Sequence, residues 1–212
     1  AWQDYFATVM QELGGTRLKS DANLYYFAQK DVYLLVYVDD LMMVGSNVDE
    51  LFTELQQKVL LKPTGSLDQG HTVKFLGRRL HREGDTVHIR PAGNYVKNLL
   101  EDFGLTSSNP VNTTGNNNLK DTTMGASRLD DTETTRFQSC VGKLMWLIPI
   151  RPDINYATKE LSRSLREPTI EDQAKLKHLL RYLKGTMDHY IDITPQIMST
   201  SDAQLELNVF VD

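Results

Sequence analysis

The chain has 212 residues with a single cysteine, Cys140, and it carries a formal net charge of −5 at pH 7. Its 40% apolar and 24% charged residues are typical of a globular protein that can bury a sizeable core in one or two domains. The composition excludes an intramolecular disulfide, and no apolar run is long enough to span a membrane.

The first 60 residues predict a helix, three strands and a second helix. Apolar residues recur at helical spacing over 2–13. β-Branched and aromatic residues then predict strands at 24–28, 32–38 and 41–44, with a tight hairpin between the last two. A polar cap with a glutamate three positions later begins the next helix, over 48–59.

The rest of the chain predicts a hairpin, a linker and mainly helices. Strands at 73–80 and 86–89 flank a turn, and a helix follows at 95–103. Residues 106–131 are rich in Ser, Asn, Thr, Gly and Asp and predict a flexible polar linker. After it come three predicted helices, around 137–148, 154–165 and 170–183. A capping-box-like pair, Thr169 and Asp172, marks the start of the last helix. A short strand is predicted at 190–193, with little left in the sequence to pair with it.

Two adjacent carboxylates, Asp39 and Asp40, interrupt the apolar run between Val32 and Val44. A two-residue hairpin turn would place both at its tip, where carboxylates either stay in water or hold a cation. The alternative is an Asp-Asp pair that is present only for its turn propensity.

With its flanks, the segment Tyr37-Val38-Asp39-Asp40 resembles the reverse transcriptase of copia-type LTR retrotransposons, whose palm carries a Tyr-x-Asp-Asp hairpin. Other segments are similar to that family in order and spacing. They are Ser20–Tyr25, Leu34–Leu41, Lys74–Gly77, Phe103–Leu105, Ser139–Met145, Arg151–Ile154 and Leu180–Thr186. An ordered series of this kind is far more specific than four residues alone.

The resemblance implies an α+β fold, in which an incomplete antiparallel polymerase palm sheet packs on helices and a helical thumb- or connection-like bundle follows. The implied domains are a partial palm with both hairpins at 1–105, the flexible linker at 106–131, the thumb-like region at 132–195 and the start of a truncated ribonuclease H-like domain at 196–212. In that last domain Asp212 would match a first catalytic carboxylate, whose partner acids the sequence does not contain.

The chemistry implied is nucleotidyl transfer from a deoxynucleoside triphosphate to a primer 3′ hydroxyl, directed by an RNA or DNA template. Such transfer uses two magnesium ions held by oxygen ligands. Asp39 would ligate metal and Asp40 would add charge beside it, while Tyr37 and Val38 would lie under the primer strand.

A second set of residues would hold the primer end: Phe75, Leu76 and Gly77 in a grip-like hairpin, followed by Arg78 and Arg79. Residues 71–100 contain six basic and two acidic side chains, so phosphate binding is compatible with the acidic total charge. The alternatives are a core strand with a glycine bend and a solvated arginine face.

One departure from the family limits the activity that we expect. A further metal-binding aspartate normally comes from an upstream palm strand, and no acid upstream of Asp39 lies in an apolar strand. Two carboxylates on one tip cannot replace a ligand from a neighbouring strand. We therefore expect the chain to be a slice of a longer polyprotein and to be inactive alone.

Three interpretations remain open at this stage: a fragment of a polymerase, a non-catalytic nucleic-acid-binding remnant, and a relic of a transposable element without activity. The expected partners are the template-primer, the deoxynucleoside triphosphate and the remainder of the polyprotein, with no membrane. We expect an intracellular setting, cytoplasmic or nuclear, and a buried structural role for Cys140 on the apolar side of its helix.

Overall fold

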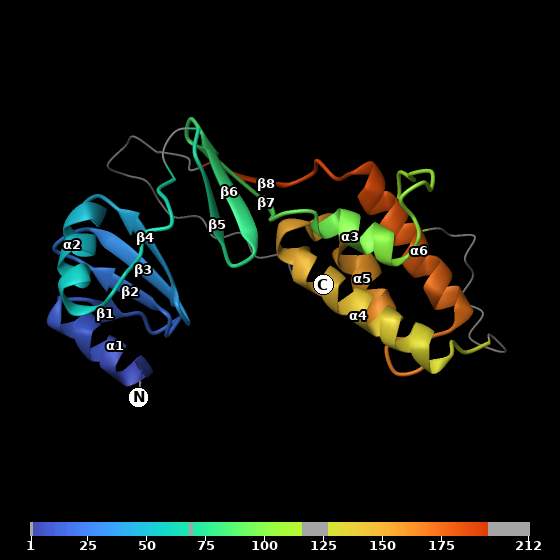
Figure 1. The fold of residues 1–212 in the computed structure, drawn as a ribbon, viewed down its shortest axis with the longest axis horizontal. Helices are drawn as coiled ribbons and strands as arrows, with labels where there is room; N and C mark the ends of the chain where they lie inside the picture. The colour runs from blue at the N-terminus through green and yellow to red at the C-terminus, as the bar shows by residue number, and fades with distance from the viewer. Residues whose placement is uncertain (1, 68–69, 116–126, 195–212) are drawn as a thin grey trace, which may run out of the picture. The chain divides into compact units, whose positions relative to one another are not determined.

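The computed structural model describes residues 2–67, 70–115 and 127–194 (Figure 1). The predicted ribonuclease H-like start at 196–212, with Asp212, lies outside the described residues, and so does part of the predicted linker. No helix within the described residues combines the length and the apolar character that crossing a bilayer requires.

The chain forms two compact units, each with a hydrophobic core of its own. The first unit contains Ala1–Ser66 and Val73–Gly77, and the second contains Leu67–Thr72 and Arg78–Asp212. The described residues combine two antiparallel sheets with helices, so the predicted α+β class is confirmed.

A four-stranded antiparallel sheet with the order β1-β2-β3-β4 forms the centre of the first unit (Figure 1). Its elements are α1 (Trp2–Glu12), β1 (Thr16–Arg17), β2 (Leu24–Phe27), β3 (Val32–Tyr37), β4 (Asp40–Gly45) and α2 (Val48–Lys58). All of them except the two-residue β1 are predicted from the sequence, with boundaries that differ by a residue or two.

Strand alternation directs one face of this sheet into the core. Phe27, Val32 and Leu34 are at most 2% exposed and pack in one cluster with Met10 of α1 and Leu51 of α2. Full burial of such side chains contributes about 1.5–3 kcal/mol each relative to exposure in water. The two helices and the sheet therefore stabilise one another.

A second antiparallel sheet has the order β5-β6-β7-β8. Its strands are β5 (Thr72–Phe75), β6 (Arg78–Glu83), β7 (Thr86–Pro91) and β8 (Ile191–Ile193). The short C-terminal strand, predicted without an evident partner, pairs with β7: Ile191 lies opposite Ile89, and Asp192 lies opposite His88. Pairing with a strand about a hundred residues earlier is not visible in a local sequence pattern.

Helices form the remaining core of the second unit (Figure 1). They are α3 (Tyr95–Asp102), α4 (Asp131–Leu147), α5 (Asn155–Ser162) and α6 (Ile170–Gly185), with short 3-10 turns at Ile148–Ile150 and Pro152–Ile154. The predicted capping box on α6 is confirmed, because the Thr169 hydroxyl accepts a hydrogen bond from the Asp172 backbone N–H and the Asp172 carboxylate accepts one from Thr169.

The helix α3, which the sequence analysis groups with residues 1–105, packs in this second core: Leu99 is 1% exposed and belongs to one cluster with Phe137 and Leu180. Residues 106–113 contain no helix or strand, yet side chains of α6 bind their carbonyl groups. Lys184 donates to Thr106 and Ser108, the latter at 2.6 Å.

Candidate nucleic-acid interface and catalytic hairpin

The β3–β4 hairpin places the two aspartates differently from the sequence prediction. Tyr37 and Asp40 are paired residues at the end of the ladder, so the two-residue turn consists of Val38 and Asp39. The prediction that both aspartates lie in the turn is therefore wrong. Asp39 is in the turn, and Asp40 begins β4, because the register of the apolar residues extends the ladder by one pair.

The turn is strained at Val38, whose φ is +54°. A positive φ is rare for a β-branched residue and costs on the order of 1–3 kcal/mol. Two-residue hairpins favour it, since it matches the turn to the right-handed twist of the strands. The side chain is 70% exposed, so the strain does not serve core packing.

Asp39 and Asp40 supply the type of ligand that a hard cation prefers, but they supply too few ligands to hold one alone. Both carboxylates are exposed and adjacent, and magnesium prefers carboxylate oxygen and water ligands. Within the described ranges, no group of three or more His, Cys, Asp or Glu side chains is arranged to hold a metal ion.

Exposed apolar side chains lie along one face of the β3–β4 hairpin. Tyr33, Tyr37 and Val44 are 45%, 54% and 61% exposed, and none of them belongs to the buried cluster under α1 and α2. Tyr26 stacks on Tyr33 with ring centroids 4.5 Å apart. Tyr37 is the cross-strand partner of Asp40 and is the exposed ring beside the carboxylates, whereas Tyr33 and Val44 pair near the other end of the two strands. An exposed ring in this position is compatible with contacts to nucleotides, whose bases and sugars offer flat apolar surface.

The grip-like residues Phe75, Leu76 and Gly77 form the end of a strand and a turn. Leu76 has φ +48° and Gly77 has φ +73°, so both are in the left-handed region, between Phe75 at the end of β5 and Arg78 at the start of β6. The single strand predicted over 73–80 is therefore wrong, since left-handed residues break the strand into a hairpin.

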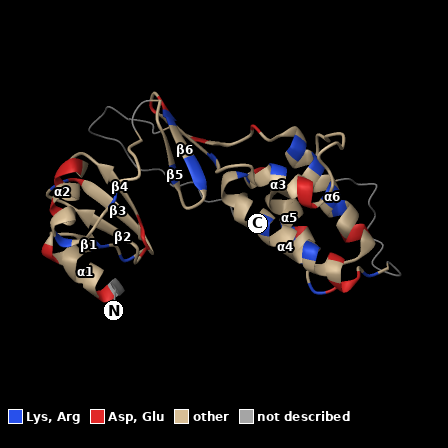
Figure 2. Cartoon of the chain, in the orientation of Figure 1, with Lys and Arg blue, Asp and Glu red and all other residues tan. Residues whose placement is uncertain are grey.

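Strand alternation separates Arg78 and Arg79 onto opposite faces of β6. The guanidinium of Arg78 lies 5.8 Å from the ring centroid of Trp146 in α4. Arg79 lies opposite Arg90 of β7. Figure 2 marks the basic positions along the ribbon of β6 in blue. No sequence signal distinguishes Arg90 or Trp146, because only the strand register and the helix packing bring them beside the predicted arginines.

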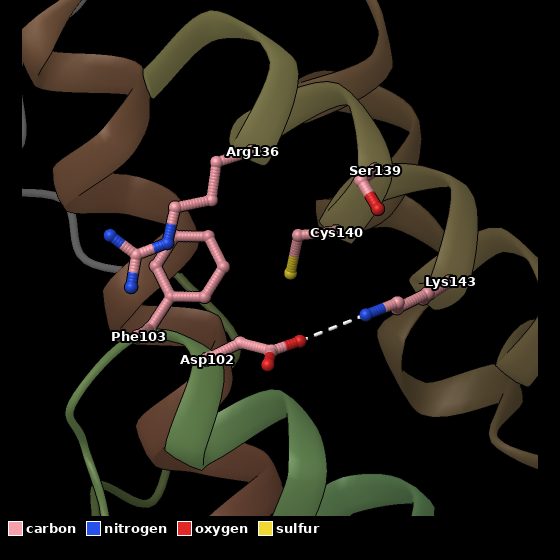
Figure 3. A pocket seen from close by; sticks show the side chains of 6 residues that line it. All are labelled: Asp102, Phe103, Arg136, Ser139, Cys140 and Lys143. Atoms are coloured by element: carbon pink, nitrogen blue, oxygen red, sulfur yellow. Dashed lines mark hydrogen bonds and ion pairs between the residues drawn. The ribbon is translucent and has the colours of Figure 1, made fainter. Parts of the chain in front are cut away.

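A pocket of about 200 Å³ lies between α3 and α4, and Asp102, Phe103, Arg136, Ser139, Cys140 and Lys143 line it (Figure 3). Lys143 donates to Asp102 at 2.8 Å, and the guanidinium of Arg136 lies 4.6 Å from the ring centroid of Phe103. The cationic groups of the pocket are thus already engaged within the protein.

Cys140 is 2% exposed, which confirms its predicted buried position. Burial, which penalises the charged form, raises the pKa of its thiol to about 12. The thiolate is the nucleophilic form, so Cys140 is not an activated nucleophile at neutral pH.

Arg151 is the centre of a buried polar network that joins two of the family-like segments. Its side chain is 3% exposed, and it donates to both oxygens of Asp153 at 2.9 and 2.7 Å and to the backbone and side-chain oxygens of Thr186 at 2.9 and 2.7 Å. Tyr182 also donates to Asp153 at 2.9 Å. Burial alone would raise the pKa of Asp153, but the hydrogen bonds from Arg151 and Tyr182 and the charge of Arg151 outweigh burial and lower it. This network is structural.

Comparison with known proteins adds independent information. The family model described as "Reverse transcriptase (RNA-dependent DNA polymerase)" matches residues 1–116. The chain is 32% identical to a retrovirus-related Pol polyprotein from transposon RE2 of Arabidopsis thaliana, over 90% of this chain and 13% of that polyprotein. It is 28% identical to a putative transposon Ty5-1 protein of Saccharomyces cerevisiae, over 100% of this chain and 66% of that protein.

A third similar protein is an uncharacterized mitochondrial protein of Arabidopsis thaliana, which is 31% identical over 74% of this chain and 63% of its own length. The chain spans only about 13% of the length of the Arabidopsis Pol polyproteins that it matches. No solved structure matches it significantly.

Proposed function

The chain belongs to the reverse transcriptase (RNA-dependent DNA polymerase) family, and on this basis we propose that it is the part of a copia-type retrotransposon polymerase that follows the first metal-binding strand. The observation that carries the proposal is the β3–β4 hairpin, which presents Asp39 and Asp40 at the exposed end of an antiparallel sheet. The reaction is nucleotidyl transfer to a primer 3′ hydroxyl.

Each residue of the hairpin has a distinct role in this proposal. Asp39 ligates metal from the turn, and Asp40 adds negative charge from the first position of β4. Magnesium held there by Asp39 and Asp40 together with a further carboxylate would supply the activation of the 3′ hydroxyl and the stabilisation of the leaving pyrophosphate. Tyr37 and Val38, both more than half exposed, support the primer strand from below. Phe75, Leu76 and Gly77 position its end.

The remaining ligand is proposed to come from the rest of the polyprotein. In the first sheet β4 is an edge strand, so its outer backbone groups are available to a further strand. A strand paired there that carries an aspartate near its end would bring a third carboxylate beside Asp39 and Asp40. This chain would therefore supply only the two carboxylates of Asp39 and Asp40 to the metal site.

The domain roles are part of the same proposal: residues 1–105 as a partial palm, 106–131 as a linker, 132–195 as a thumb- or connection-like region and 196–212 as the start of a ribonuclease H-like domain. The compact units of the structure divide the chain near residue 77. Because α3 packs with α4 and α6, we assign α3 to the thumb-like body.

Primer extension tests the proposal. With magnesium and a labelled RNA–DNA template-primer, we expect no incorporation by the 212-residue chain and incorporation by a longer chain that includes the upstream polyprotein. Asp39→Asn in the longer chain should abolish the product, and Arg166→Gln, on an exposed loop, should not. A longer chain that extends equally well with Asp39→Asn would contradict the assignment.

The second candidate function is nucleic-acid binding without catalysis, which the arginines of β6 favour. Template-primer binding that weakens steeply with salt, together with no extension even by the longer chain, would support this candidate over the first.

A further inference from the structure

Two adjacent cross-strand pairs of basic residues occupy one face of the β6–β7 hairpin. Arg79 lies opposite Arg90, and two residues along each strand His81 lies opposite His88. Residues that are directly opposite have Cβ atoms about 4.5–5.5 Å apart, and like charges in such positions are destabilising. An arginine pair in this position therefore opposes folding unless something compensates for it.

The nearby carboxylates do not compensate, because both contact His88. Asp192 Oδ1 lies 2.6 Å from its Nδ1, and Glu83 Oε2 lies 3.6 Å from its Nε2. Neither Arg79 nor Arg90 forms an ion pair with any residue in the described part of the chain. Other arginines of this unit, such as Arg151, do have carboxylate partners.

Arg90 is nevertheless held in a defined position. Its guanidinium lies 4.6 Å from the ring centroid of Tyr190, just before β8, and its Nε is buried without a hydrogen-bond partner. Stacking on an aromatic ring fixes the planar guanidinium and leaves its terminal N–H groups as donors. The pairing of β8 with β7 thus brings the ring that orders Arg90.

We propose that Arg79 and Arg90 together bind one phosphate group of a nucleic-acid backbone, with Tyr190 as the platform that orients Arg90. A phosphate accepts charge-assisted hydrogen bonds from both guanidinium groups and removes their repulsion. This inference rests on the proposed function, and it adds Arg90 and Tyr190, which come from a strand and a segment outside the predicted grip.

The first test measures binding of the 212-residue chain to a mixed-sequence DNA duplex at several salt concentrations. Arg90→Gln should weaken binding roughly tenfold and make the slope of log K against log salt shallower by about 0.9, the change for one lost phosphate contact. Arg166→Gln removes the same charge from an exposed position of the same unit and should change neither quantity as much. Equal effects of the two variants would overturn the proposal.

The platform has its own variants. Tyr190→Phe keeps a ring under Arg90 and should bind as the unaltered chain does, whereas Tyr190→Leu should lose several-fold in affinity. If Tyr190→Leu binds unchanged, the platform role is wrong.

A second measurement separates this inference from the proposed function. Inorganic phosphate is titrated into protein with ¹⁵N-labelled arginine, and the side-chain N–H signals are assigned with the glutamine variants. The signals of Arg79 and Arg90 should shift at phosphate concentrations that leave Arg166 unchanged. If the longer chain fails to extend primers but these shifts occur, the proposed polymerase function fails and the phosphate site stands. If Arg79, Arg90 and Arg166 respond alike, the site does not exist, whatever the duplex does.

Discussion

The buried thiol of Cys140 shows how position in a helix decides residue chemistry. Burial between α3 and α4 raises its pKa to about 12, against about 8.5 for a free cysteine. At pH 8 we expect iodoacetamide to modify the folded protein at least about a hundredfold more slowly than the chain in denaturant, because so little thiolate is present. Mass spectrometry of timed samples gives both rates. Equal rates would mean that the helix pair opens readily.

The buried Arg151 network gives a stability prediction. Arg151→Gln leaves Asp153 without its bidentate partner and should lower the free energy of unfolding by about 3 kcal/mol, measured by urea denaturation. Arg163→Gln is the control, since Arg163 pairs with Glu160 at 73% side-chain exposure and such a pair contributes less than about 1 kcal/mol. A similar loss of unfolding free energy in both variants would show that the burial of Arg151 does not explain its contribution to stability.

The pKa of Asp153 also predicts a pH dependence. The folded-state pKa is lowered, so the unfolded chain binds a proton more readily, and stability falls as pH decreases. The contribution is complete above the ordinary aspartate pKa of about 4 and is lost as pH falls through the lower folded value. Asp153→Asn should flatten that part of the stability curve, measured by denaturation between about pH 2 and 5. An unchanged slope would assign the acid sensitivity to other carboxylates.

Two glycines in different elements should respond to alanine in opposite directions. At Gly45, at the end of β4, a Cβ atom would lie 2.1 Å from the Asp31 carbonyl oxygen, so Gly45→Ala should destabilise the protein by several kcal/mol. At Gly142, in the middle of α4, a Cβ atom would meet nothing within 4 Å, so Gly142→Ala should stabilise the protein by about 1 kcal/mol. Thermal unfolding of both variants checks the pair, and a loss at Gly142 would contradict it.

Local elements follow from the sequence, whereas long-range pairings do not. Periodicity correctly predicts β2, β3, β4 and α2, and the end signals correctly predict the capping box of α6. At α2 the helix begins where predicted, but the side chain of Asn47 forms no capping hydrogen bond. They cannot show that Val38 takes a positive φ, since Gly or Asn normally supplies it. They also cannot show which helices α3 joins.

The candidate site is likewise predictable from the sequence only where it depends on local residues. Asp39 and Asp40 stand out in the sequence because charges interrupt an apolar run, but which of them lies in the turn depends on ladder register. Arg90 and Tyr190 give no signal of their own. Only the packing of β8 on β7 brings their side chains together.

At the scale of the whole molecule, separate cores predict separate responses to mutation. Leu34 in the first unit and Leu144 in the second are fully buried, and each Leu→Ala change should cost about 2–5 kcal/mol. Since the two leucines belong to different clusters, Leu34→Ala should lower amide hydrogen-exchange protection in the first unit and Leu144→Ala in the second. Loss of protection throughout the chain from either change would instead indicate one cooperative body.

The contact between His88 and Asp192 spans 104 positions of the chain, and this has a consequence for synthesis on the ribosome. The β7 strand emerges early, but its partner β8 emerges only after α3, α4, α5 and α6 have been translated. Throughout that interval the nascent chain carries an open strand edge, which is a template for pairing with other chains. A premature stop codon anywhere between α3 and β8 would make that exposure permanent, so we expect such truncated products to aggregate.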